Sequence, residues 1–165
     1  MKTFLIALVL LATACGNSVV GPNPTPGPQP VPLPPSKETK AIVALFGSYT
    51  CSICTKEIPE LHDYLKKNMS DIQSSFRVDL YVVGGPGGGS VSQSQATDYA
   101  KKLGVDFNPI PDSFCRTHYK QYFQGSCAVP ATVVLKQDGT VYRNFGKGVV
   151  SFSELQRAVR ELVKP

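Results

Sequence analysis

The chain has 165 residues, of which 42% are hydrophobic and 18% are charged, so it is long enough to bury one core and too short for several domains. Its 14 glycines and 14 prolines follow no three-residue period, which excludes a collagen-like chain. The formal net charge of +5 comes from scattered Lys and Arg residues rather than from a basic stripe, and we therefore exclude nucleic acid as a partner.

The first 14 residues have the pattern of a signal peptide. Lys2 supplies a positive start, and residues 4–11 form an apolar run much shorter than the roughly 20 residues that cross a bilayer. The small residues Ala-Thr-Ala then lead to Cys15, an arrangement that resembles a bacterial lipobox. The resemblance implies cleavage before Cys15, lipidation of that cysteine and, because Gly16 follows where a retention signal places Asp, the outer membrane. The alternative is an ordinary cleavage site beside a chance cysteine.

Residues 15–36 are predicted to be a lipidated cysteine followed by a proline-rich linker. Eight of the 14 prolines lie between Pro22 and Pro35, among small or polar residues that cannot bury a core. In the polyproline II conformation, which rises about 3.1 Å per residue, roughly 15 such residues span about 45 Å. We therefore expect a lipoprotein of the bacterial cell envelope whose domain, residues 37–165, faces the periplasm from a membrane anchor.

Hydrophobic patterns in that domain predict an α/β fold. The apolar run at 41–46 is typical of a strand buried on both faces, and apolar residues at helical spacing predict a helix from Ser52 to about Lys67. A second strand is predicted at 76–83, followed by a helix that ends at Gly104. The remaining predicted elements are a helix capped by Asp112 that holds Cys115 and His118, hairpin strands at 131–136 and 141–145, and a last helix behind the capping box Ser151-x-x-Glu154.

Four cysteines remain once Cys15 is assigned to lipid. An even number of cysteines in an exported chain implies disulfides, and four cysteines allow three pairings. The unit Cys51-x-x-Cys54 can close its short loop when both thiols sit in the first turn of a helix. This choice leaves Cys115 to pair with Cys127, which we expect to be a structural disulfide. The alternative is an electron relay between the two pairs.

Two widely separated segments carry a family resemblance. The first is Cys51-x-x-Cys54-x-x-Glu57-x-Pro59-x-Leu61 after the first strand, and the second is Val129-Pro130-Ala131 before the hairpin. With these segments the chain, over about residues 40–163, resembles the TlpA/ResA-like thiol-disulfide oxidoreductases, which are membrane-tethered proteins of bacterial envelopes. The resemblance implies a thioredoxin-like fold, with a central mixed sheet flanked by helices and a cis-proline loop facing the helix N-terminus that carries the Cys-x-x-Cys motif.

Three residues depart from the family's pattern. Thr50 replaces the usual Trp before the motif, Ile53 replaces the frequent Pro within it, and Leu45 stands where thioredoxins keep a buried Asp. Because Leu45 has no carboxylate, Glu57 is the available proton acceptor for the second cysteine. The resemblance implies this active-site role, and a solvated helix residue is the alternative interpretation.

The redox chemistry predicts a different role for each cysteine of the motif. An exposed cysteine at a helix N-terminus has its pKa lowered from about 8.5 into the range of roughly 3.5 to 7.5, so Cys51 is the predicted nucleophile. Cys54, deeper in the first turn, is expected to resolve the mixed disulfide that forms with a substrate. If Pro130 is cis, the resemblance implies that Val129 and Pro130 bind an extended substrate strand.

We therefore expect an envelope thiol-disulfide oxidoreductase with a redox-active Cys51/Cys54 centre. Its partners would be protein thiols and disulfides and an upstream redox donor or acceptor, with reduction of substrates favoured over oxidation. No cofactor and no metal site are expected. Two alternatives are a copper-handling protein that uses Cys51 and Cys54 as soft ligands, and a non-catalytic interaction module that keeps the thioredoxin-like fold.

Overall fold

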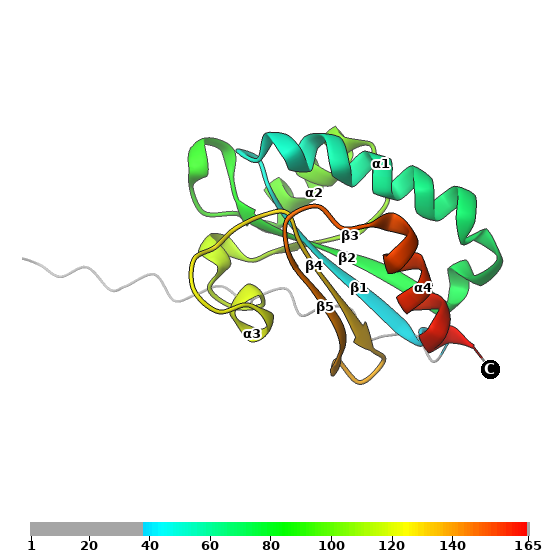
Figure 1. The fold of residues 1–165 in the computed structure, drawn as a ribbon. Coiled ribbons are helices and arrows are strands. Elements are labelled where there is room, and N and C mark those ends of the chain that lie inside the picture. Colours follow the sequence, from blue (N-terminus) through cyan, green and yellow to red (C-terminus); the bar gives the residue numbers. More distant parts are fainter. Residues whose placement is uncertain (1–37, 165) are drawn as a thin grey trace, which may run out of the picture.

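A mixed five-stranded sheet forms the centre of residues 38–164, the part of the chain that the computed structural model describes (Figure 1). The strands are β1 (Ala41–Ser48), β2 (Phe76–Gly84), β3 (Asn108–Pro111), β4 (Ala131–Lys136) and β5 (Val141–Lys147), in the order β3-β2-β1-β4-β5. β1 pairs in parallel with β2, which pairs in parallel with β3, whereas β4 is antiparallel to both β1 and β5. The predicted mixed sheet is therefore confirmed.

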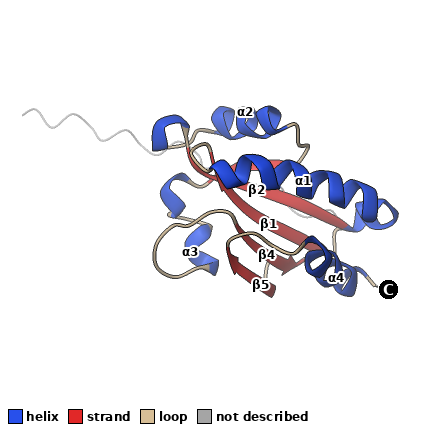
Figure 2. Ribbon diagram, turned by 45° about the horizontal axis from the view of Figure 1, so that its top comes forward, coloured by secondary structure: helices blue, strands red, loops and turns tan. Residues whose placement is uncertain are grey.

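Helices cover both faces of this sheet. They are α1 (Ser52–Asn68), α2 (Gln93–Leu103), α3 (Tyr119–Tyr122) and α4 (Phe152–Val163), with 3-10 turns at Ser70–Ser75, Pro86–Gly88 and Ser113–Cys115. α1, α2 and α4 contribute buried residues to one core, and the short α3 contributes to the other, on the opposite face (Figure 2). Among residues 38–164, no helix is long and apolar enough to cross a bilayer. The predicted signal peptide, Cys15 and the linker lie outside these residues.

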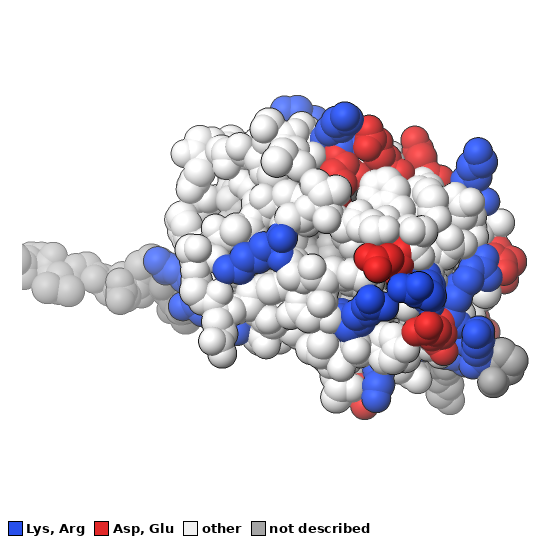
Figure 3. Space-filling view, viewed as in Figure 1, with Lys and Arg blue, Asp and Glu red and all other residues white. Residues whose placement is uncertain are grey.

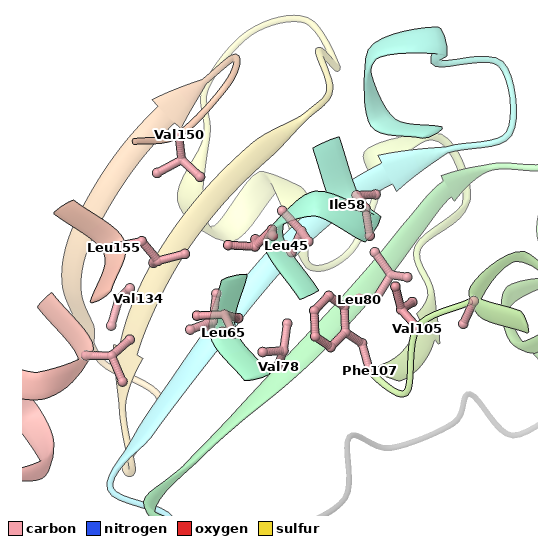
Figure 4. Packing of buried hydrophobic residues seen from close by; sticks show 14 of the residues in the cluster. Leu45, Ile58, Leu65, Val78, Leu80, Val105, Phe107, Val134, Val150 and Leu155 are labelled. Atoms are coloured by element: carbon pink, nitrogen blue, oxygen red, sulfur yellow. The ribbon is translucent and has the colours of Figure 1, made fainter. Parts of the chain in front are cut away.

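The central strand β1 is buried along its whole length, as its apolar run predicts. Successive side chains of a strand point to opposite faces, so Val43 and Leu45 join the core under α1 and α4, whereas Ala44 and Phe46 join the core beside α3. Figure 4 shows Leu45 of β1 and Ile58 of α1 among the buried side chains of this first core. The ring of Phe46 stacks on Tyr81 of β2 with 4.8 Å between centroids. The end of β1 is therefore held from both sides.

One strand escapes sequence analysis. β3 has the sequence Asn-Pro-Ile-Pro and lies at an edge of the sheet, where proline is tolerated. The Asp112 N–H donates to the Val82 carbonyl oxygen at 2.9 Å, so alternate residues of this segment face β2. Pro109 and Pro111 consequently face away from β2, where their missing N–H groups leave the ladder intact, and the Pro109 carbonyl accepts from Gln93 Nε2 at 2.9 Å. The sequence did not predict this strand, because two of its four residues are prolines.

The predicted helix with Asp112 as its cap is wrong. Cys115 has a φ of 57°, in the left-handed region, which a helix cannot contain. The chain makes a 3-10 turn there, and α3 begins only at Tyr119. The Asp112 carboxylate instead accepts the backbone N–H groups of residues 117–119 at 2.7 to 3.1 Å, and so fastens the segment that follows the turn.

The capping box predicted for the last helix is also absent. Ser151 is the N-cap of α4, but its side chain makes no cap hydrogen bond and pairs with the Ser153 hydroxyl at 3.1 Å. Glu154 instead forms an ion pair with Arg157, one turn along the helix, with 3.6 Å between its Oε1 and a guanidinium nitrogen. A complete capping box stands at α2, where Ser92 and Gln95 exchange hydrogen bonds of 3.3 and 2.9 Å.

Replacing Asp112 with Ala tests its fastening role. Asp112→Ala leaves three N–H groups without their acceptor, and we expect the free energy of unfolding to fall by about 2–4 kcal/mol. Denaturant unfolding followed by circular dichroism measures this loss. The control Asp98→Ala, on the exposed face of α2, is expected to change stability by about 0.5 kcal/mol or less. Equal effects of the two substitutions would contradict the assignment.

Candidate active site

The Cys-x-x-Cys motif lies at the junction where β1 gives way to α1. Cys51 is the N-cap residue of α1, and its N–H donates to the Ser48 carbonyl oxygen at 3.1 Å. Its Sγ accepts the Cys54 N–H at 3.1 Å and is bonded to the Cys54 sulfur, with 5.2 Å between the two Cα atoms. Cys51 is half-buried, whereas Cys54 is fully buried. A partner can therefore reach the first sulfur of the pair and not the second.

The first turn of α1 is electrostatically suited to a thiolate. Its unpaired N–H groups give the helix N-terminus a partial positive charge, and no acidic residue stands in that turn to offset it. In the reduced protein, the same N–H groups would stabilise a negative sulfur at Cys51. The sequence predicts this placement because the buried strand ends directly before the motif.

Residues packed beneath the junction hold it in place. The Tyr99 hydroxyl of α2 donates to the Ser48 carbonyl oxygen at 3.0 Å. A Cβ on Gly47 would lie 2.8 Å from Ile58 Cδ1 of α1, so a larger residue there would force the Ile58 side chain to shift. Sequence analysis did not assign Tyr99 or Gly47 to the site. The one clue in the sequence was the glycine that ends the apolar run of the first strand, and nothing in the sequence pointed to Tyr99.

The proline loop faces the same sulfur. The Val129–Pro130 peptide bond is cis, as the resemblance implies, and the Val129 carbonyl oxygen lies 3.6 Å from Cys51 Sγ. Pro130 is buried, and its carbonyl oxygen accepts the Gly148 N–H at 2.7 Å, which ties the loop to the end of β5. Two segments 78 residues apart in sequence thus meet at one sulfur atom.

A groove of about 610 Å³ opens at this meeting point. Its lining includes Cys51, Ile53, Phe114, Cys127 and Val129. Ile53 and Phe114 are large apolar residues that stay about half exposed, at 55% and 47%. On the face shown in Figure 3, charged side chains gather around α4 and the end of α1, and few lie where α1 begins. Sequence analysis missed Phe114, because its position depends on its own left-handed φ of 59°.

Glu57, one turn after Cys54, is buried rather than solvated, with 6% of its surface exposed. Oε1 accepts the Val150 N–H at 2.9 Å, and Oε2 has no hydrogen-bond partner among the described residues. Burial raises the pKa of Glu57 above its ordinary value, and nearby Glu60 adds to the rise, while the Val150 N–H partly opposes it. The alternative of a solvated helix residue is therefore wrong. The carboxyl group is placed on the same side of α1 as Cys54.

The other cysteines form a second bond beside the groove. Cys115 and Cys127 are bonded, with 5.8 Å between their Cα atoms. Cys115 is buried and Cys127 is exposed. Within residues 38–164, no group of three or more His, Cys, Asp or Glu side chains is placed to hold a metal ion. Leu45, which replaces the buried Asp of thioredoxins, is 2% exposed and belongs to the apolar core.

Neither the family models nor the curated proteins compared with the chain match it. Solved structures do. A thiol:disulfide interchange protein of the thioredoxin family from Chlorobium tepidum TLS has a TM-score of 0.57 and 19% sequence identity over 77% of this chain and 82% of that chain. StoA from Bacillus subtilis has a TM-score of 0.53 and 19% identity over 75% and 84%.

A third similar structure is the pneumococcal exposed lipoprotein thioredoxin of Streptococcus pneumoniae strain TIGR4. It has a TM-score of 0.52 and 19% identity over 76% of this chain and 87% of that chain. At such identities the likeness concerns the arrangement of the backbone. Together with the mixed sheet, the motif at the start of α1 and the cis proline opposite it, the likeness shows that the described part of this chain has a thioredoxin-like fold.

Proposed function

We propose that this protein is a thiol-disulfide oxidoreductase that exchanges disulfides with protein substrates through Cys51 and Cys54. The observation that carries the proposal is the unequal exposure of the two bonded sulfurs at the N-terminus of α1, beside the Val129 carbonyl oxygen. A disulfide that serves only stability gains nothing from one reachable sulfur in a groove. An exchange reaction requires it, because the attacking thiolate must meet one sulfur of the partner in line with its bond.

In the reducing direction, the Cys51 thiolate attacks one sulfur of a substrate disulfide. A bond forms between the two sulfurs, and the other substrate sulfur leaves as a thiolate and takes up a proton. Cys54, after losing its proton, attacks Cys51 Sγ and releases the first substrate sulfur as a second thiol. The substrate disulfide has gained two electrons, and Cys51 and Cys54 are bonded as in the structure described above.

Glu57 is proposed as the acceptor of the Cys54 proton. Both residues are buried in the first two turns of α1, where water has little access. The raised pKa of Glu57 brings its carboxylate closer in basicity to a thiol than an ordinary glutamate would be, which favours proton transfer between them. Leu45 leaves the site without a second carboxylate from β1.

Reduction of substrates is the proposed direction. Strong oxidants of this kind stabilise the thiolate of their reduced form heavily. Here the Cys54 N–H is the hydrogen-bond donor found at Cys51 Sγ among the described residues, and Ile53 contributes an alkyl group rather than another donor. The groove is lined by uncharged residues, among which Ile53 and Phe114 are large and apolar, and it suits a polypeptide whose cysteine is flanked by uncharged residues. An upstream redox partner would return Cys51 and Cys54 to the dithiol form.

The proposed location is the bacterial cell envelope. The apolar run of residues 4–11 and the lipobox-like segment at Cys15 support export and a lipid anchor in the outer membrane. The proline-rich segment between Pro22 and Pro35 would then hold the domain in the periplasm, where protein disulfides form.

An insulin-reduction assay tests the exchange activity. We expect wild-type protein to accelerate reduction by dithiothreitol, Cys51→Ser to lower the rate to that of dithiothreitol alone, and Cys54→Ser to accumulate a mixed disulfide with substrate, because attack continues without resolution. Mass spectrometry of acid-quenched samples detects the trapped species. Equal rates for wild type and Cys51→Ser, with both proteins folded, would refute the proposal.

A pH series tests the role of Glu57. Only the carboxylate form accepts a proton, so the rate of mixed-disulfide resolution should rise as the pH passes the pKa of Glu57, which lies above the ordinary 4.5. Glu57→Gln is expected to lose this rise and to slow the step by roughly 100-fold at neutral pH. Glu60→Gln, the matched control, should only move the rise to lower pH, since Glu60 raises the pKa of Glu57.

Thermal unfolding separates this effect from a loss of structure. The pKa of Glu57 is raised in the folded state, so its carboxylate costs stability increasingly as the pH rises through that pKa. Glu57→Gln, which keeps an acceptor for the Val150 N–H, should therefore unfold at a temperature no lower than wild type at pH 7. A Gln variant with the wild-type pH profile would exclude Glu57 as the proton acceptor.

Metabolic labelling with a fatty acid tests the anchor. We expect the full-length chain to incorporate label and to sediment with membranes, and Cys15→Ser to lose both properties, since several acyl chains on one cysteine suffice for stable anchoring. Membrane fractions and the labelled band are compared at equal expression. Release of the wild-type chain into the soluble periplasmic fraction would favour an ordinary cleavage site.

A further inference from the structure

Both disulfides of the described domain open onto the same groove. Cys127 lines it together with Cys51, and each belongs to a pair with one reachable and one buried sulfur. Cys115 is 2% exposed and Cys54 is fully buried, whereas their partners face the groove. The second pair therefore repeats the asymmetry on which exchange at the first pair depends.

The two reachable cysteines are close along the loop that separates them. The Val129 carbonyl oxygen lies 3.6 Å from Cys51 Sγ, and Cys127 precedes Val129 by two residues. Two residues span at most about 7 Å even when fully extended. Cys127 is therefore held at the same groove as Cys51, and exchange requires the loop to carry Cys127 Sγ up to Cys51 Sγ.

The segment between Cys115 and Cys127 is fastened independently of their bond. The Tyr119 hydroxyl donates to the Ala128 carbonyl oxygen at 2.9 Å and accepts the Ala128 N–H at 3.0 Å. Lys147 Nζ of β5 donates to the carbonyl oxygens of Gln124 and Ser126 at 3.0 and 2.9 Å. Opening the disulfide would leave these contacts in place, so Cys127 would stay at the groove in the reduced form.

The backbone at Cys115, the buried cysteine of the second pair, has an unfavourable conformation. Phe114 and Cys115 have φ values of 59° and 57°, in the left-handed region that glycine adopts much more easily than residues with a side chain. Such a conformation costs free energy that the surroundings must supply. Exposed disulfides are more readily reduced than buried ones, and Cys127 is exposed.

We propose that Cys115–Cys127 is a second redox-active disulfide, which exchanges electrons with the Cys51/Cys54 pair across the groove through Cys127 Sγ. This inference rests on the proposed function. It differs from a purely structural role in one measurable respect, which is that the second bond opens and closes with the first.

The exchange balances within the chain. The Cys51 thiolate attacks Cys127 Sγ, the bond between Cys127 and Cys115 breaks, and Cys115 leaves as a thiolate that takes up a proton. Cys54 loses its proton and attacks Cys51 Sγ, which releases Cys127 as the second thiol. Cys51 and Cys54 are oxidised to the disulfide, and Cys115 and Cys127 are reduced by the same two electrons. The reverse sequence returns them, so a fully reduced domain can serve two substrate disulfides.

Cross-linking tests whether the two reachable sulfurs meet. In full-length protein with Cys15→Ser, the combination Cys54→Ser/Cys115→Ser leaves Cys51 and Cys127 free. With glutathione disulfide as oxidant, we expect an internal Cys51–Cys127 bond, identified by peptide mass mapping. The matched control Cys54→Ser/Cys127→Ser leaves Cys51 with the buried Cys115 and should form mixed disulfides with glutathione instead. Absence of the Cys51–Cys127 bond, or equal cross-linking in both variants, would overturn the proposal.

A second measurement follows the wild-type chain itself, whose folding no substitution disturbs. Oxidised protein is mixed with limiting dithiothreitol, quenched with acid and alkylated, and the label on each cysteine is followed over time. We expect Cys115 and Cys127 to be labelled roughly tenfold faster in wild type than in Cys51→Ser/Cys54→Ser, because exchange within one chain has the higher effective concentration.

The outcomes separate this inference from the function on which it rests. If Cys51–Cys54 opens and reduces insulin while Cys115–Cys127 stays closed, or opens equally fast in Cys51→Ser/Cys54→Ser, the inference fails and the proposed function stands. If neither bond opens under conditions that reduce insulin, both fail. Labelling of the second pair that follows the first, and slows without it, supports both.

Discussion

The positive end of α1 meeting Cys51 Sγ is the interaction on which the rest of the site depends. The Cys54 N–H approaches this sulfur to 3.1 Å only because β1 stops three residues earlier and the chain turns sharply. The turn is held by its own hydrogen bonds, from the Cys51 N–H to the Ser48 carbonyl oxygen and from the Thr50 N–H to Ser48 Oγ, and by the residues packed around it. Gly47 lets Ile58 approach the strand, and Tyr99 binds the carbonyl of Ser48. Burial of β1 on both faces makes this base rigid, which keeps the helix dipole aimed at one atom.

Unequal burial assigns the chemical roles around that atom. Cys51 and Cys127 face the groove, and their bonded partners Cys54 and Cys115 lie in the core, so attack from outside has one possible target in each pair. Glu57 lies one turn after the buried cysteine of the first pair, where burial raises the pKa of its carboxyl group. The groove therefore presents one sulfur of each bond, at the end of the molecule where α1 begins.

Much of the fold follows from patterns that are local in sequence. The apolar run of β1, the helical spacing of α1 and the hairpin of β4 and β5 each appear within a short, continuous stretch of sequence, and the motif cysteines mark the junction. The features that the sequence did not predict depend on contacts between distant segments. Phe114 and Cys115 take left-handed φ values next to the segment that Asp112 holds at residues 117–119, and the local sequence does not predict this conformation. The burial of Glu57 likewise depends on Val150, 93 residues away.

The edge strand β3 has a consequence for a protein that would handle incompletely folded chains. Its two prolines face outward and offer no amide hydrogen to an approaching polypeptide, and the carbonyl of Pro109 is already occupied by Gln93. A sheet with a free border ordinarily invites foreign strands to join it, which is the first step toward aggregates. Here that border is blunted, so a polypeptide that approached β3 would find no outward-facing amide hydrogen at its two prolines.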